Sequence, residues 1–133
     1  METVQYFATK GAGEIAYNAL YYATTLKVGN IITISGQGGW DDNFEVTAKS
    51  LEEEIEIACN NVETALNAAG ASWEDVVSVQ SYHVGMERTG ELMPEQFRKR
   101  ISDHRPLWTG IGVDALALPT MHVEIVVTAI VKE

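Results

Sequence analysis

Glu124 is the strongest candidate for a reactive side chain in this sequence. It lies in the stretch HVEIVVTAIV, where every second residue from Val123 to Val131 is apolar. This period of two predicts a strand with one buried face, and it places Glu124 on the other face. A carboxylate there is costly to bury unless it is paired or neutralised. Two interpretations are open: a general acid or base whose pKa is raised by burial, or a structural glutamate in a salt bridge across the sheet.

Polar residues that could assist Glu124 come earlier in the chain. Residues 31–37 are predicted to form a strand with Thr33, Ser35 and Gln37 on one face, and Gly36 lies between the last two. The glycines at positions 36, 38 and 39 resemble part of a phosphate loop. The Lys-Ser/Thr pair of such loops is missing, so the sequence predicts no nucleotide cofactor.

The other polar clusters indicate neither a metal site nor a cofactor. Four glutamates between positions 52 and 56 fall near the start of a predicted helix, where they suit the helix dipole and form a solvated face. No set of His, Cys, Asp or Glu has the spacing of metal ligands. His83 is predicted to be a hydrogen-bonded structural residue, and Cys59 a buried hydrophobic one.

The hydrophobic pattern predicts an α/β fold in a single domain that spans residues 1–133. Helices are predicted at residues 51–69 and 93–101, and strands at residues 4–7, 23–28, 31–37, 76–84, 107–113 and 123–131. Ser50 with Glu53 is typical of a capping box at the start of the first helix, and Gly70 is typical of its end. The resulting order is β-β-β-α-β-α-β-β, in which two helices cover one face of a sheet.

The two faces of the predicted sheet differ in polarity. The face expected beneath the helices carries Ile32, Ile34, Ile111, Val123, Ile125 and Val127. The other face is expected to carry Thr33, Ser35, Trp108, Gly110, Gly112, Glu124 and Thr128, with some aliphatic residues. That face is too apolar for open water, and no part of the chain is left to cover it. We therefore predict an obligate oligomer with small-molecule clefts between subunits; the alternative is a monomer with a solvated face.

The charge balance excludes several classes of partner. The chain has 19 acidic and 9 basic residues, a formal net charge of −10. Nucleic acids and anionic membranes both attract basic surfaces, so neither is expected as a partner. No stretch is apolar for long enough to span a membrane, and the first residues lack the apolar segment of a secretory signal. Together with the single cysteine, these features predict a cytoplasmic protein.

Three stretches, taken in order, resemble the YjgF/RidA family. They are YYATTLKVGNIITISGQ, then NVETALNAAGASWEDVVSV, and finally RPLWTGIGVDAL followed by HVEIVVTAIV. The resemblance covers most of the chain. It implies a chorismate-mutase-like fold and a barrel-like homotrimer with three clefts between subunits. For the best-known branch it also implies hydrolysis of reactive 2-imino or enamine intermediates to 2-keto acids and ammonia.

The resemblance assigns roles to individual residues of this chain. Glu124 matches the family's glutamate and is the implied catalytic residue. Ser35 matches the family's serine, and Gly36 matches the glycine beside the pocket. Tyr22 matches the family's tyrosine by its spacing from Ser35. Tyr21 is one residue away from that position, so a slip of one residue between the two tyrosines stays open.

Three positions depart from the family's pattern. Trp108 occupies the position of the arginine that clamps the substrate carboxylate, Gly110 stands where many members have cysteine, and Pro94 where many have asparagine. The Pro-x-Trp-Thr version is similar to the YjgH-like branch, which lacks that arginine. Arginine is a charged bidentate clamp, whereas tryptophan offers a flat face and one N–H donor. Breaking such a charge pair costs about 3–5 kcal/mol, which predicts weak hydrolysis of small 2-imino acids.

Trp108 and Gly110 are still predicted to line the substrate site. Trp108 either stacks on a ligand or packs against a neighbouring subunit, and both interpretations stay open. Arg105 is close enough in sequence to replace the missing arginine, but the geometry of the strand is expected to aim it elsewhere.

The sequence supports two functions of different classes. The first is a hydrolase, deaminase or tautomerase that acts on imine or enamine metabolites, with Glu124 moving a proton and with Ser35 and Tyr22 donating hydrogen bonds. The second is a protein that binds or senses a metabolite in the same cleft without turnover. A third activity, ribonuclease, is reported for some members of the family, and the acidic balance of this chain argues against it.

Overall fold

A mixed sheet with helices on one face forms the framework of this computed structural model, which describes residues 3–132. Strands β1, β2, β3, β7, β5 and β6 are neighbours in that order, and the short β4 pairs with β7 beside β3. Every pair is antiparallel except β5 with β6. The strands are β1 (Val4–Phe7), β2 (Thr25–Val28), β3 (Ile31–Ile34), β4 (Gln37–Gly38), β5 (Val76–His83), β6 (Leu107–Gly112) and β7 (Val123–Ile130).

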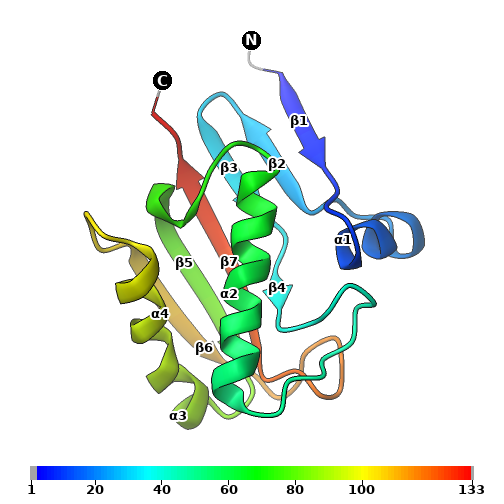
Figure 1. Cartoon of the computed structure of the whole chain (residues 1–133), viewed down its shortest axis with the longest axis vertical. Coiled ribbons are helices and arrows are strands. Elements are labelled where there is room, and N and C mark those ends of the chain that lie inside the picture. Colours follow the sequence, from blue (N-terminus) through cyan, green and yellow to red (C-terminus); the bar gives the residue numbers. More distant parts are fainter. Residues whose placement is uncertain (1–2, 133) are drawn as a thin grey trace.

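Two main helices, α2 (Leu51–Asn67) and α4 (Met93–Arg100), lie across one face of this sheet (Figure 1). The predicted order of strands and long helices is therefore confirmed. Shorter helices join them: α1 (Ala12–Ile15), a π-helical turn at Ala16–Leu20, a 3-10 turn at Trp73–Asp75, α3 (Met86–Thr89) and a second 3-10 turn at Gly90–Leu92. The third predicted strand is interrupted after Ile34, and Gln37–Gly38 pairs separately with β7.

Helix α2 forms because its apolar residues recur at helical spacing and cover the sheet. The side chains of Ile55, Ala58, Cys59, Val62 and Leu66 are fully buried against β3 and β7. The Ser50 hydroxyl caps its start by accepting a hydrogen bond of 3.1 Å from the Glu53 N–H. At its end Gly70 has a φ of 85°, a left-handed conformation that glycine adopts without strain.

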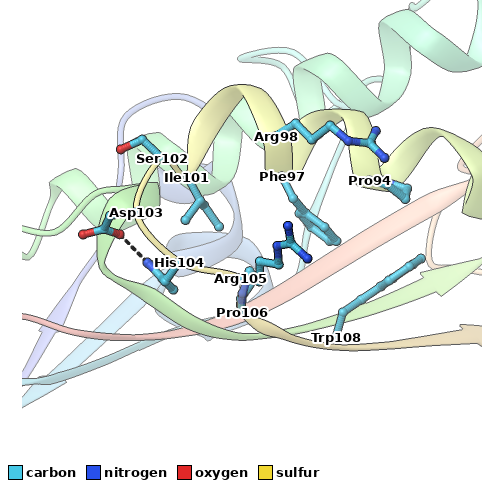
Figure 2. A pocket seen from close by; sticks show the side chains of 10 residues that line it. All are labelled: Pro94, Phe97, Arg98, Ile101, Ser102, Asp103, His104, Arg105, Pro106 and Trp108. Carbon is cyan, nitrogen blue, oxygen red and sulfur yellow. Dashed lines mark hydrogen bonds and ion pairs between the residues drawn. The ribbon is translucent and has the colours of Figure 1, made fainter.

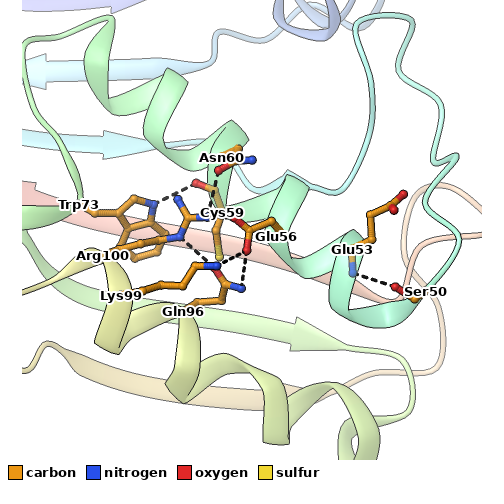
Figure 3. Close-up of polar contacts among 9 residues, drawn as sticks. All are labelled: Ser50, Glu53, Glu56, Cys59, Asn60, Trp73, Gln96, Lys99 and Arg100. Atoms are coloured by element: carbon orange, nitrogen blue, oxygen red, sulfur yellow. Dashed lines mark hydrogen bonds and ion pairs between the residues drawn. The ribbon is translucent and has the colours of Figure 1, made fainter.

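A cluster of charged side chains ties α4 to α2 (Figure 3). The Glu56 carboxylate accepts hydrogen bonds from Lys99 Nζ at 2.5 Å, Arg100 NH2 at 2.9 Å and Gln96 Nε2 at 3.1 Å. Beneath it the buried Trp73 ring donates its N–H to the Cys59 carbonyl oxygen at 2.9 Å. The position of α4 over the sheet edge therefore depends on both polar and apolar contacts.

Replacing Glu56 by glutamine is expected to lower stability in a pH-dependent way. The hydrogen bonds from Lys99 and then Gln96 hold the pKa of Glu56 below its ordinary value. A carboxyl with a lowered pKa stabilises the fold above its unfolded-state pKa, and this stability is lost as the pH falls through its folded pKa. Urea denaturation should therefore separate wild type from Glu56→Gln by about 1 kcal/mol near neutral pH and not in strong acid. A difference that persists in strong acid would contradict this assignment.

One predicted strand has its two faces exchanged. In β6, Trp108 pairs with Val79 and Gly110 with Ser81, and both partners are buried beneath the helices. Consequently Trp108, Gly110 and Gly112 lie on the helix face, and Ile111 lies on the open face with Glu124, contrary to prediction. The physical reason is the packing of Trp108, whose ring contacts Phe97 of α4 and whose indole N–H donates to the buried Ser81.

Candidate functional site

Glu124 lies in the middle of β7 on the open face of the sheet, half-buried and opposite Tyr82 of β5 and Gly38 of β4. Within residues 3–132 its carboxylate has neither a hydrogen bond nor an ion pair. Burial raises the pKa of Glu124 above its ordinary value. The interpretation of Glu124 as half of a salt bridge is therefore wrong for the part of the chain that the structure describes. An unpaired acid whose pKa is raised by burial suits proton transfer.

Gly36 lies directly against the Glu124 side chain. A Cβ at position 36 would overlap Oε2 of Glu124 and lie 2.7 Å from its Cδ. The φ of Gly36 is outside the left-handed region, so glycine is needed here for space and not for backbone conformation. The backbone of the segment between β3 and β4 therefore packs directly against the Glu124 carboxylate.

Tyr22 is the tyrosine that lies near Glu124. Burial first, and the nearby charge of Glu124 second, raise the pKa of Tyr22, so its phenol is a neutral hydrogen-bond donor. Tyr22 is 39% exposed, whereas Tyr21 is 96% exposed and has a left-handed φ of 64°. The geometry therefore favours Tyr22 over Tyr21 as the tyrosine of the site.

Ser35 lies between Tyr22 and Gly36, but its hydroxyl is already engaged. Ser35 Oγ donates a hydrogen bond of 2.7 Å to the Ala23 carbonyl oxygen. In this orientation the hydroxyl can accept a hydrogen bond from a ligand but cannot donate one. Gln37 supports this segment by donating from Nε2 to the Ser35 carbonyl oxygen at 3.1 Å. The prediction of Ser35 as a hydrogen-bond donor to substrate needs a rotation of this hydroxyl.

Tyr82 is a neighbour of the site that sequence reasoning missed. Tyr82 is half-buried and directly opposite Glu124 in the β5–β7 register. Gln37 was predicted on the same face as Thr33 and Ser35, and this is wrong, because Gln37 is buried and pairs with Ile125, on the helix side of β7. The alternation of β5 could have placed Tyr82 on the polar face, but the register that sets it against Glu124 depends on pairing and not on local pattern.

Trp108 and Gly110, the other two predicted site residues, lie on the opposite side of the sheet from Glu124. The Trp108 ring contacts Phe97 of α4 edge to face, with ring centroids 5.4 Å apart. Its indole N–H donates to Ser81 Oγ at 2.9 Å, so the N–H is not free for a ligand. Within one chain, therefore, Trp108 and Gly110 are separated from the Glu124 group.

A buried network of hydrogen bonds continues from Trp108 through Ser81 and His83 to Thr89, and Thr89 sets its direction. The Thr89 hydroxyl donates its proton to the Gly85 carbonyl oxygen at 3.3 Å, so it accepts from His83 Nδ1 at 2.7 Å. The neutral His83 ring then accepts at Nε2 from Ser81 Oγ at 2.7 Å, while Ser81 accepts from the indole N–H. Burial lowers the pKa of His83, in keeping with this neutral form. The prediction of His83 as a hydrogen-bonded structural residue is confirmed.

A cavity of about 680 Å³ lies beside Trp108, between α4 and residues 101–106 (Figure 2). Arg105 and Trp108 both line it, so the expectation that Arg105 points away from the surroundings of Trp108 is wrong. A smaller hollow of about 290 Å³ lies beside Tyr22 and Ser35. The chain thus carries two half-sites: the Glu124 group on the open face, and the Trp108 cavity on the helix face.

Across residues 3–132, no three His, Cys, Asp or Glu side chains are grouped so that they could hold a metal ion. None of the helices described is both long and apolar enough to cross a membrane.

Known proteins share both the sequence pattern and the fold of this chain. The sequence profile of the family described as endoribonuclease L-PSP matches residues 14–131. The RutC family protein YjgH of Escherichia coli (strain K12) is 27% identical over 97 residues, which are 72% of this chain and 73% of that protein. Protein MMF1, mitochondrial, of Saccharomyces cerevisiae is 25% identical over 114 residues, 86% of this chain and 77% of that protein.

Solved structures share the fold of this chain. The structure of protein YJGH has a TM-score of 0.80 at 27% identity and covers 96% of this chain and 98% of its own. The crystal structure of YEO7_yeast shares the fold, with a TM-score of 0.84 at 23% identity over 98% of this chain and 100% of its own. Because the profile spans nearly the whole sequence, the chain belongs to the endoribonuclease L-PSP family, which is the YjgF/Rid family that its motifs resemble.

Proposed function

We propose that this protein is an oligomeric enzyme that hydrolyses or tautomerises imine or enamine metabolites, and that its single domain carries the whole activity. The observation that carries the proposal is the Glu124 carboxyl, which is half-buried, lacks a partner among the described residues and has a pKa raised by burial. Such a group can act as a general acid or base. Neither a metal nor a cofactor is required for this chemistry.

The proposed reaction adds water across a C=N bond. The Glu124 carboxylate takes one proton from water as the water oxygen attacks the imine carbon, and it passes this proton to the nitrogen, which gives a neutral tetrahedral amino alcohol. The hydroxyl proton then moves by way of Glu124 to the nitrogen as the C–N bond breaks, so that ammonia leaves and the C=O of the keto product forms. Tyr22, held neutral by its raised pKa, donates a hydrogen bond to the developing charge. An enamine reaches the imine when its carbon accepts a proton from the protonated Glu124 carboxyl and its nitrogen gives one back to the carboxylate.

We also propose that the active assembly is a homotrimer. The open face of the sheet exposes large apolar side chains, including Leu107 at 75% and Tyr6 at 66% exposed. Exposed apolar side chains on a sheet face are typical of an interface, and further copies of the chain would cover them. Within one chain Glu124 and the Trp108 cavity lie on opposite faces of the sheet, so an active site that used both would need two copies. A monomer mass in light scattering would refute this assembly.

The remaining features support a small metabolite as the partner. The net charge of −10 disfavours nucleic acid, including RNA as a substrate, and disfavours anionic membrane surfaces. The single cysteine, Cys59, is buried and free, which suits a cytoplasmic location.

A second candidate function is metabolite binding without turnover. The observation that favours it is the separation of the Trp108 cavity from Glu124 on opposite faces of the chain. A protein that uses this cavity alone would bind a ligand with no acid beside it. The two functions differ in one measurable outcome, which is ammonia release.

An ammonia assay with freshly generated imines tests the proposed function. Amino-acid oxidases or lyases would supply 2-aminoacrylate and bulkier aromatic imines in the cuvette, with wild type and Glu124→Gln compared. We expect wild type to hydrolyse the bulkier imines faster than 2-aminoacrylate, and Glu124→Gln to lose about 10²–10⁴-fold, the usual contribution of a general acid or base. Ligand binding with no turnover of any imine would favour the second function instead.

A further inference from the structure

The cavity between α4 and β6 is large enough for a ligand of considerable size. Its volume of about 680 Å³ falls within the usual range of roughly 300–1,000 Å³ for small-molecule sites. Figure 2 shows that one wall comes from α4, with Phe97 and Arg98, and the other from the segment Arg105, Pro106 and Trp108. A two-carbon or three-carbon imino acid would leave most of this space empty.

The wall that contains Trp108 presents a flat, apolar ring. Its indole meets Phe97 of the opposite wall edge to face, at an interplanar angle of 75°, and Pro106 lines the cavity on the Trp108 side. The hydrogen bond from Trp108 to Ser81, backed by the buried His83, fixes the indole ring in place. Since the indole N–H is already used, the ring offers a ligand its face and not a donor. This wall fits an aromatic or other planar apolar group.

The lining also contains two arginines, Arg98 and Arg105, in a chain that is strongly acidic overall. Arg105 lacks any hydrogen bond or ion pair to another described residue. Arg98 makes only a long contact of 3.5 Å with Glu95, and both of those side chains are largely exposed. The one acidic group in the lining, Asp103, is engaged by His104 at 2.5 Å. Two guanidinium groups are therefore left to meet an anion.

His104 holds the Arg105 segment in place. Its two ring nitrogens face acceptors, Asp103 Oδ1 at 2.5 Å and the Val76 carbonyl oxygen at 2.6 Å. Both nitrogens must then donate, so the ring is an imidazolium that links the loop before β6 to the start of β5. Arg105 follows directly on this anchored residue, which limits the positions its guanidinium can take.

We propose that this cavity binds a planar, preferably aromatic, carboxylate, with the Arg105 guanidinium on the carboxylate and the ring of the ligand against Phe97 and Trp108. Arg98 adds positive charge at the rim. The inference rests on the proposed function only in naming the substrate class, an aromatic imino or keto acid. Binding itself is independent of Glu124, which lies on the other face of the chain.

Calorimetric titration with phenylacetate and with phenylacetamide, its neutral analogue of the same shape, tests the proposal. We expect wild type to bind phenylacetate at least tenfold more tightly than the amide. Arg105→Gln should remove this preference by weakening phenylacetate alone. Trp108→Leu should weaken both ligands, because it removes the flat wall. Arg88→Gln changes an exposed arginine outside the cavity and should bind as wild type does.

Equal binding of the acid and the amide would overturn the proposal, as would undiminished binding of phenylacetate by Arg105→Gln or no binding by wild type. Circular dichroism of each variant shows whether it is folded, and Arg98→Gln offers a second charge removal on the helix wall should Arg105→Gln fail to fold. Binding that depends on Arg105 in a protein that releases no ammonia would refute the proposed catalysis and leave this site standing.

Discussion

Gly36→Ala is expected to remove turnover almost as completely as Glu124→Gln, with the protein still folded. The new Cβ would overlap Oε2 of Glu124 and approach its Cδ and Cγ to 2.7 and 2.8 Å. The half-buried glutamate side chain is flexible, so it can swing aside at small cost to stability. Its carboxylate would then leave the position beside Tyr22, and the rate should fall by about 10²–10⁴-fold, the usual contribution of a general acid or base.

The measurement is the rate of ammonia release together with the midpoint of thermal unfolding. Gly112→Ala is the matched control, because a Cβ there would meet its nearest atom, Met86 Cβ, at an ordinary 3.6 Å. It should keep both the activity and the midpoint of wild type. Full activity in a folded Gly36→Ala protein would show that the observed position of the Glu124 carboxylate is not the catalytic one.

Glu54→Ala is expected to have the largest effect on stability among the acidic residues of α2. Glu54 is buried, although its neighbours in sequence suggested a solvated face. Its carboxylate accepts from the His122 backbone N–H at 2.7 Å and meets His122 Nδ1 at 2.8 Å. Each hydrogen bond to a charged group contributes about 1.5–3 kcal/mol, so removal of both should lower the free energy of unfolding by about 3 kcal/mol.

Urea denaturation would measure this loss, with Glu52→Ala as the control on the exposed side of the same helix. Glu52→Ala should stay within about 0.5 kcal/mol of wild type, as surface substitutions usually do. Because His122 lies two residues before Glu124, Glu54→Ala should also reduce activity by loosening the start of β7. Equal stability of the two variants would mean that the contact with His122 does not hold this strand.

The sequence was informative where one alternation was unambiguous. Along β7 every second residue is apolar and buried, so the face of Glu124 followed from the pattern alone. Along β6 the pattern did not identify the buried face, because Leu107 and Trp108 are both apolar and the glycines carry no hydrophobic signal. The helix face of β6 is set by its pairing with β5 and by the contacts of Trp108 with Ser81 and Phe97, which are tertiary contacts that no local period reveals.

The candidate site was predictable to a similar degree. Tyr22, Ser35, Gly36 and Glu124 were named from motif positions, and the structure places them together on or beside the open face. The opposition of Tyr82 to Glu124 depends on the register between two strands more than 40 positions apart. The burial of Glu54 depends on His122, 68 positions away. Local patterns can orient a side chain, but they cannot name a distant partner.

The complete burial of the Cys59 sulfur beneath α2 has a practical consequence. Burial raises the pKa of its thiol to about 12, so almost no thiolate exists at neutral pH. Oxidants and alkylating reagents act on exposed thiolates, and therefore they reach this sulfur only when the helical layer lifts from the sheet. The rate at which Cys59 is modified therefore measures how often the native structure opens. A cysteine introduced at the surface could be labelled with little competition from Cys59.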